Sequence, residues 1–283
     1  MTVMPPLIGI GYRHPLHDWT VKNLACFDVL EVVVDHYLTG GTAYRDSLGS
    51  LQGRVPVTAH GIGLSLGSAE PLDYDYVEQI AEITSLIGAT RFSEHVAFTR
   101  SSGIDLANLL PLPKTRETLD FLVERLREVC RIMPVPVSLE NITYLFDYNY
   151  GEMSDAEFLI RLCERTETTL LLDIQNLYTN ALNHHFDPVD FLNALPRGIV
   201  KSVHMAGGQE MEHVEIDTHS FPVRDEVLAL LGLMRTLQSP DTIILERDGR
   251  LDAPNEMLDD IDNIRARYDL APAGNTHVHP LAS

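Results

Sequence analysis

The chain has 283 residues, of which 45% are hydrophobic and 22% charged, a composition typical of a globular protein with a full-sized core. It carries 21 basic and 41 acidic residues, and the resulting net charge of −20 argues against nucleic acid or an anionic membrane as a partner. No apolar run reaches the ~18 residues of a membrane span, and the first residues lack a basic segment followed by an apolar core. We therefore expect neither a transmembrane helix nor a secretory signal.

The three cysteines, Cys26, Cys130 and Cys163, are far apart and show no metal-ligand spacing. Their number and spacing do not fit a disulfide framework, which indicates a reducing compartment. We expect a cytoplasmic protein.

Short β-rich runs alternate with amphipathic helical stretches along the chain. Several runs are almost continuously apolar, such as LEVVV at 30–34 and TIIL at 242–245, which is typical of parallel strands buried on both faces. The predicted strands cover residues 7–12, 29–34, 55–59, 90–93, 135–139, 170–172, 199–203 and 242–245.

The clearest predicted helix covers residues 114–133, where apolar side chains recur every three or four positions. Further helices are predicted over 73–87, 154–165, 223–237 and 255–268, and Asp or Ser stands near several helix starts as a capping residue would. Eight strand–helix repeats predict an α/β protein, a single (β/α)8 TIM barrel over residues 1–270. We expect residues 271–283 to form an irregular tail.

Metal-ligand side chains gather where the chemistry of such a barrel lies, at the C-terminal ends of the strands. Six consecutive predicted strands end in an imidazole or a carboxylate, namely His60, Glu94 with His95, Glu140, Asp173, His204 and Glu246. The following loops add His184 and His185 after the sixth strand, and Asp217 and His219 after the seventh.

A single histidine at a strand end is more often a hydrogen-bonded core residue than a ligand, but the joint pattern points to metal. Carboxylates crowded at one mouth repel each other unless cations neutralise them, and imidazoles among carboxylates are the ligands of nitrogen/oxygen metal sites. About nine candidates exceed what one ion needs, which favours two or three ions. With no cysteine in the set, iron, manganese and catalytic zinc remain open.

Three polar residues at the ends of the first two strands, Arg13, Asp35 and His36, are candidates for substrate contact or for structural roles. The cysteines fall on predicted helices away from the strand ends, so we do not expect a nucleophilic role for them.

Eight ordered motifs resemble those of the multinuclear non-heme iron-dependent oxidative enzymes, the family that includes the methanobactin oxidase MbnB and TglH. The resemblance covers roughly residues 7–265. The motifs are HGIGLS at 60–65, SEH at 93–95, LEN at 139–141, LLDIQN at 171–176, NALNHHFDP at 180–188, VHMAGG at 203–208, DTHSFPV at 217–223 and ILERD at 244–248.

The resemblance implies a TIM barrel with two or three irons of mixed Fe(II)/Fe(III) valence. It also implies O2 as co-substrate and oxidative modification of cysteine residues in a ribosomally made precursor peptide, often beside a small partner protein that binds the leader.

The resemblance further implies a role for each ligand position. His60 and His95 would bind one iron, and Glu140 would bridge to a second held by Asp173, His204 and Glu246. His184, Asp217 and His219 would hold the third. Asn176 and Asp248 would lie beside the ligands, with Asp248 transferring protons. Asp35 and His36 replace the usual Glu-Asn pair, which points to altered substrate contacts.

Other functional classes remain as alternatives. Barrels with such clusters also serve as divalent-metal sugar isomerases and as metal-dependent hydrolases. Sugar isomerases usually place a lysine near the metals, and no lysine occurs in the strand-end motifs, since Lys201 lies inside the seventh predicted strand. A further alternative is a metal-holding, peptide-binding subunit without catalytic activity, which O2 consumption with a cysteine-containing peptide would exclude.

Overall fold

A closed eight-stranded parallel barrel forms the centre of the computed structural model, which describes residues 4–39 and 41–268. The strands follow the order β1-β12-β9-β8-β7-β4-β3-β2 around the barrel. Their bounds are β1 Leu7–Tyr12, β2 Val29–Val33, β3 Val57–Gly61, β4 Phe92–His95, β7 Val137–Glu140, β8 Thr169–Asp173, β9 Val200–Met205 and β12 Thr242–Leu245. The predicted TIM barrel is confirmed.

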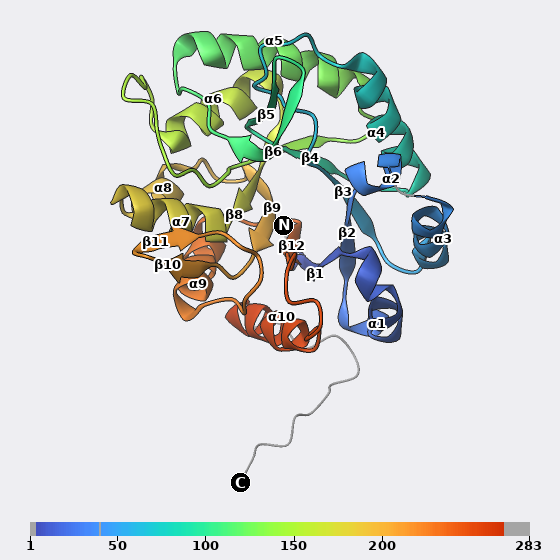
Figure 1. Ribbon diagram of the computed structural model, residues 1–283. Helices are drawn as coiled ribbons and strands as arrows, with labels where there is room; N and C mark the ends of the chain where they lie inside the picture. The colour runs from blue at the N-terminus through green and yellow to red at the C-terminus, as the bar shows by residue number, and fades with distance from the viewer. Residues whose placement is uncertain (1–3, 40, 269–283) are drawn as a thin grey trace.

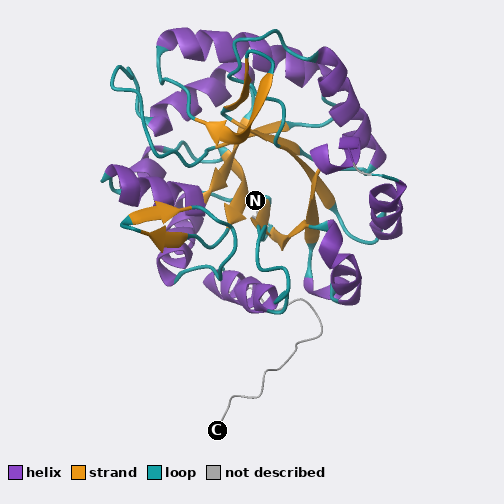
Figure 2. Ribbon diagram, in the orientation of Figure 1, coloured by secondary structure: helices purple, strands orange, loops and turns teal. Residues whose placement is uncertain are grey.

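Helices surround the strands, as Figures 1 and 2 show in a view along the barrel. Two short 3-10 helices, His14–Leu16 and Leu24–Cys26, flank the first helix. The α-helices are α1 His17–Lys22, α2 Asp35–Thr39, α3 Thr42–Leu51, α4 Tyr74–Leu86, α5 Arg116–Ile132, α6 Asp155–Thr166, α7 Ile174–His184, α8 Pro188–Ala194, α9 Asp225–Leu237 and α10 Glu256–Arg267.

The five helices predicted from sequence are present to within two residues at each end, and three of them begin at a capping side chain. The side chains of Asp73, Thr115 and Ser154 accept a hydrogen bond from a backbone N–H in the first turn of α4, α5 and α6. The predicted tail, 271–283, lies outside the described residues.

Two of the strands that begin later than predicted, β3 and β7, have a proline in the predicted range. Pro56 and Pro136 lack the backbone N–H that a strand ladder needs, so β3 begins at Val57 and β7 at Val137. Both strands then extend past the predicted ends, which places His60 and Glu140 inside the strands.

Two antiparallel hairpins were not predicted: β5 Phe98–Ser101 with β6 Ile104–Leu110, and β10 Gln209–Met211 with β11 Val214–Ile216. They follow β4 and β9, so both rise from the C-terminal mouth of the barrel. The mostly exposed β6 lacks the apolar alternation that marks a half-buried strand.

The loop after β11 packs unusually close to the barrel. A Cβ atom on Gly207 would lie 2.1 Å from the carbonyl oxygen of Phe221, so only glycine fits there. This close approach carries the segment with Asp217 and His219 back over the barrel mouth.

Candidate metal centre

Strand register brings the predicted ligands together at the barrel mouth. His95 pairs with Glu140 across β4 and β7, and Asp173 pairs with His204 across β8 and β9. Potential ligand atoms lie within 4.8 Å of one another in three buried groups: Glu31, His60 and His204; His60, His95 and Glu140; and Glu140, Asp173, His204 and Glu246.

Glu140 connects two of these groups. Its Oε2 lies 3.4 Å from His60 Nε2 and 3.3 Å from His95 Nε2, whereas its Oε1 lies 3.1 Å from His204 Nδ1. Each carboxylate oxygen therefore faces different imidazoles, an arrangement suited to bridging two ions.

The second group gathers around His204, whose Nδ1 also lies 3.2 Å from Glu246 Oε2. Asp173 contributes one free oxygen to this group. Its Oδ1 caps α7 by accepting a hydrogen bond from Asn176 N at 2.7 Å, while the buried Oδ2 has no hydrogen-bond partner among the described residues.

A third set of contacts comes from the loop over the mouth. His219 Nε2 lies 2.9 Å from Asp217 Oδ1 and 3.8 Å from Asp173 Oδ2, and its Nδ1 lies 3.2 Å from Glu246 Oε2. The backbone of His219 is left-handed, with φ of 47°, a conformation that non-glycine residues keep mainly where surrounding structure demands it. Asp217 and His219 thus lie beside the cluster.

The polar atoms at this mouth match what a bound cation would satisfy. Within the described part of the chain, several buried atoms lack a hydrogen-bond partner, among them Glu140 Oε2, Asp173 Oδ2 and His95 Nδ1. Burying such groups uncompensated is costly, and nitrogen and oxygen donors of this kind suit first-row transition metals. The residues present therefore fit a centre of two or more ions.

When no metal is bound, the opposite charges of the cluster stabilise one another and shift the pKa values of its residues. Burial opposes ionisation of Glu140, but His95, His204 and His60 outweigh it and lower the pKa of Glu140 to about 2. Burial likewise opposes charge on His95, yet Glu140 and Glu94 raise its pKa to about 9. Burial and the neighbouring Asp217 and Glu140 raise the pKa of Asp173 well above its usual range, despite the opposing effect of His219. Cations must therefore displace protons to bind here.

Surrounding polar groups fix the orientation of the cluster. His60 Nδ1 lies 2.8 Å from Ser93 Oγ, which turns Nε2 towards Glu140. Asn141 forms paired 2.9 Å hydrogen bonds with the backbone N–H and carbonyl of Asp173, and Asn176 donates to the carbonyl of Asn141 at 3.0 Å. Asn176 thus lies beside Asp173.

Arg13 and Asp248 form the outer edge of the cluster. Arg13 Nε donates to Asp248 Oδ1 at 2.8 Å, and Arg13 NH2 lies 3.3 Å from Glu246 Oε1. Asp248 is half exposed and lies 3.2 Å from His219 Nδ1. Burial works against ionisation, but His219 and Arg13 lower the pKa of Asp248, so this carboxylate stays ionised and can accept a proton.

Asp35 and His36, the two candidates after the second strand, differ in their surroundings. Asp35 accepts hydrogen bonds from Ile62 N, at 2.9 Å, and from the Tyr76 hydroxyl, so it has a structural role, while His36 is exposed.

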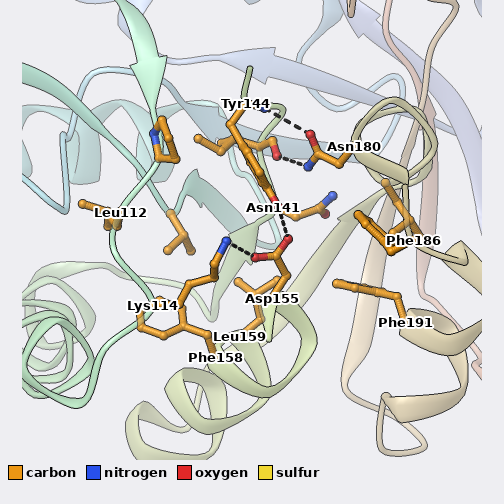
Figure 3. A pocket seen from close by; sticks show the side chains of 14 residues that line it. Leu112, Lys114, Asn141, Tyr144, Asp155, Phe158, Leu159, Asn180, Phe186 and Phe191 are labelled. Carbon is orange, nitrogen blue, oxygen red and sulfur yellow. Dashed lines mark hydrogen bonds and ion pairs between the residues drawn. The ribbon is translucent and has the colours of Figure 1, made fainter. Parts of the chain in front are cut away.

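His184 does not join the cluster in this structure. Its Nε2 lies 2.8 Å from the carbonyl oxygen of Tyr144, and the two rings lie 4.4 Å apart. Figure 3 shows Tyr144 in the adjacent small cavity of about 60 Å³, where its hydroxyl donates to Asp155 at 2.5 Å and Lys114 lies 2.6 Å from the same carboxylate. The structure therefore holds His184 apart from Asp217 and His219, the residues with which it was predicted to bind metal.

Glu31 is the functional candidate that sequence reasoning missed. It lies in the middle of β2, 2% exposed, with Oε1 2.8 Å from His204 Nε2. The only signal in the sequence was a carboxylate inside the apolar run LEVVV, since a strand buried on both faces must compensate such a charge.

A TIM barrel with a buried carboxylate–histidine cluster at the C-terminal ends of its strands is typical of an enzyme. The family model described as RiPP precursor modification enzyme MbnB/TglH/ChrH matches residues 7–269, where RiPP denotes a ribosomally synthesised and post-translationally modified peptide. The chain belongs to this family of precursor-modifying enzymes.

Curated relatives match the chain over most of its length. The UPF0276 protein of Acaryochloris marina is 35% identical over 240 residues, covering 85% of this chain and 87% of that protein. The UPF0276 protein of Caulobacter vibrioides is 30% identical over 270 residues, covering 95% and 96%.

Among solved structures, a D-tagatose 3-epimerase-like protein superposes with a TM-score of 0.59 at 15% identity, covering 93% of this chain and 98% of that one. D-psicose 3-epimerase from Clostridium cellulolyticum H10 gives 0.56 at 12% identity, covering 93% and 97%. At such identities these structures show a shared fold only. Within the described residues, no helix has the length and apolarity to cross a membrane.

Proposed function

We propose that the protein is a multinuclear iron-dependent oxidase that uses O2 to modify cysteine residues of a ribosomally made precursor peptide. The family supplies the precursor peptide as substrate class. The observation that carries the metal assignment is the position of Glu140, whose two oxygens face separate imidazoles of two adjoining groups. Nitrogen and oxygen donors without thiolate fit an iron pair or triad.

Bound iron would supply the one-electron and O2 chemistry that no side chain of the cluster offers. The chain's own residues hold the ions and exclude water. In this proposal His60, His95 and Glu140 hold one ion, and Glu140, Asp173, His204 and Glu246 hold a second. Asp217 and His219 contribute to a third.

Asp248 is the proposed proton acceptor of the site. It is the half-exposed carboxylate at the edge of the cluster, it remains ionised, and Arg13 fixes its orientation through Nε. Because a lowered pKa makes Asp248 a weak base, it would take a proton only from a thiol that a bound cation had made acidic, and it would return that proton at the end of the reaction.

The peptide, in this proposal, reaches the centre through a groove beside the β5–β6 hairpin. The groove has a volume of about 270 Å³ and is lined by residues 108–111, 143–146 and 215–217, with Thr179 and Asn183. Asp217 lines the groove and contacts His219, so the groove opens onto the cluster. Leu145 and Phe146, 68% and 49% exposed, offer apolar contact to a peptide. A small leader-binding partner protein would then hold the remote part of the substrate.

Leu145→Asp tests this groove. We expect KM for the peptide to rise about tenfold, the loss of one buried apolar contact, with metal content unchanged. Leu86→Asp is the matched control, since Leu86 is equally exposed, at 67%, but lies at the end of α4 outside the groove. Equal effects of the two substitutions on KM would contradict the assignment.

The reaction itself is tested by co-expression with short cysteine-containing peptides encoded beside the gene. Mass spectrometry should show a mass change in one peptide that disappears when its cysteine is replaced by serine, with O2 consumed in proportion. An unchanged peptide and no O2 uptake by the iron-loaded protein would overturn the oxidase proposal.

Because the sugar epimerases share this fold, a divalent-metal isomerase is the second candidate. Such enzymes usually have a lysine near the metals, whereas Lys114 and Lys201 lie outside the cluster. Lys114 binds Asp147 and Asp155 outside the cluster, and Lys201 lies 4.0 Å from Asp241 near the start of β12. Turnover of a ketose by the manganese-loaded protein would favour this candidate instead.

A further inference from the structure

A carboxylate lies beneath the metal-binding cluster, deeper in the barrel than the strand ends. Glu31 is 2% exposed and occupies the centre of β2, Val29–Val33, whose other residues are all buried and apolar. An ionised group in such a place is stable only with a close partner.

That partner is His204, which lies on β9 and is fully buried. Glu31 Oε1 lies 2.8 Å from His204 Nε2, and Thr58 Oγ1 donates to the other oxygen, Oε2, at 3.4 Å. The contact is an ion-pair distance that falls short of hydrogen-bond geometry, and among the described residues neither Glu31 Oε1 nor His204 Nε2 forms a hydrogen bond with any other group. The two atoms face each other without competition from a third group.

The opposite nitrogen of the same ring faces the cluster. His204 Nδ1 lies 3.1 Å from Glu140 Oε1 and 3.2 Å from Glu246 Oε2. A neutral imidazole carries its proton on one nitrogen and a lone pair on the other. Only the form protonated at Nε2 directs a lone pair towards Glu140 and Glu246, and a carboxylate beside Nε2 favours that form.

We propose that Glu31 is a positioning residue whose charge, 2.8 Å from Nε2 of His204, favours the proton on that nitrogen, so that Nδ1 is available to the ion shared with Glu140 and Glu246. This inference rests on the proposed metal centre. Glu31 acts through His204 and does not itself bind metal.

The alternative is that Glu31 is a ligand, since it lies with His60 and His204 in one of the three groups. His60 argues against it. Ser93 occupies its Nδ1, and its Nε2 lies 3.4 Å from Glu140 Oε2, so His60 is committed to the group of Glu140. The two roles, positioning residue and ligand, predict different numbers of bound ions when Glu31 is replaced.

Cobalt(II) titration of the metal-stripped full chain tests the proposal, with affinity, stoichiometry and the visible d–d spectrum as readouts. Glu31→Gln keeps an acceptor without its charge, and Glu31→Leu replaces the buried charge with an apolar side chain of similar size. We expect both variants to bind as many ions as the unmodified protein. Affinity at one position should fall about 10- to 100-fold, most in Glu31→Leu, with a shifted spectrum.

Thermal melting of the metal-free variants separates positioning from a merely structural role. Glu31→Leu should fold with a Tm close to that of the unmodified protein, because Glu140 and Glu246 still face the His204 ring and leave no uncompensated buried charge. Asp260→Asn is the control. It removes a buried carboxylate that contacts Arg247, at 2.7 Å, and the backbone N–H of Val223 but no side chain of the cluster, and should lower the Tm without changing the cobalt spectrum.

Three results would overturn the proposal. Unchanged affinity and spectrum in Glu31→Leu would show that Glu31 does not act on His204. Loss of one cobalt per chain in both variants would make Glu31 a ligand. Failure of the unmodified protein to bind cobalt would remove the metal centre itself, and the role of Glu31 with it.

Discussion

Replacing Glu140 with glutamine is expected to abolish activity and to remove metal from two positions at once. The carboxylate faces His60 and His95 with one oxygen and His204 with the other, and glutamine offers a neutral carbonyl and an N–H in their place. Removing a residue that only hydrogen-bonds a metal ligand lowers affinity or activity about 10- to 100-fold. Removing a bridging ligand itself should therefore lower them by more than about 100-fold.

Metal content and peptide turnover of Glu140→Gln are the measurements for this prediction. Asp260→Asn is again the control, since it removes an equally buried carboxylate without touching the cluster. If Glu140→Gln kept its full complement of metal, or lost only one ion, Glu140 would not bridge two positions.

Metal affinity is expected to rise steeply with pH because of His95. In the metal-free protein burial opposes its charge, but Glu140 and Glu94 raise its pKa from 6.5 to about 9, while the pKa of Glu140 falls to about 2. A raised pKa means that the ion pair stabilises the metal-free fold fully below pH 6.5 and loses that effect as pH rises through about 9. A metal ion needs the neutral ring, so its affinity changes in the opposite direction, by roughly tenfold per pH unit for each proton displaced.

Competition between the protein and a chelator of known affinity for cobalt(II), measured from pH 6 to pH 9, checks this expectation. His95→Ala should bind less metal and show a shallower pH dependence. His184→Gln is the matched control because the structure holds this histidine against Tyr144, outside the cluster. A flat pH profile in the unmodified protein would contradict the assignment. Metal loss in His184→Gln would instead support the ligand role that the resemblance implied.

The fold could be predicted from sequence because its signals are local. Apolar runs mark the strands, and the capping side chains of Asp73, Thr115 and Ser154 mark helix starts. The hairpin strand β6 was missed because most of its side chains are exposed and its sequence lacks the alternation of a half-buried strand.

The site could be predicted in outline because parallel strands end at a common mouth, which places His60, His95, Glu140, Asp173 and His204 together. Two features depend on packing between distant segments and were therefore not predictable. The inward position of Glu31 follows from the register of β2 with its neighbours, and the contact of His184 with Tyr144 follows from the path of the loop after β7.

Metal analysis of anaerobically purified protein, combined with Mössbauer spectroscopy of a sample grown on iron-57, measures the proposed centre directly. We expect about two or three irons per chain, some ferric and some ferrous, as the shared position of Glu140 and the number of surrounding ligands require. A protein that holds mainly zinc or manganese, and whose activity iron does not restore, would contradict the oxidase assignment and favour hydrolysis or isomerisation.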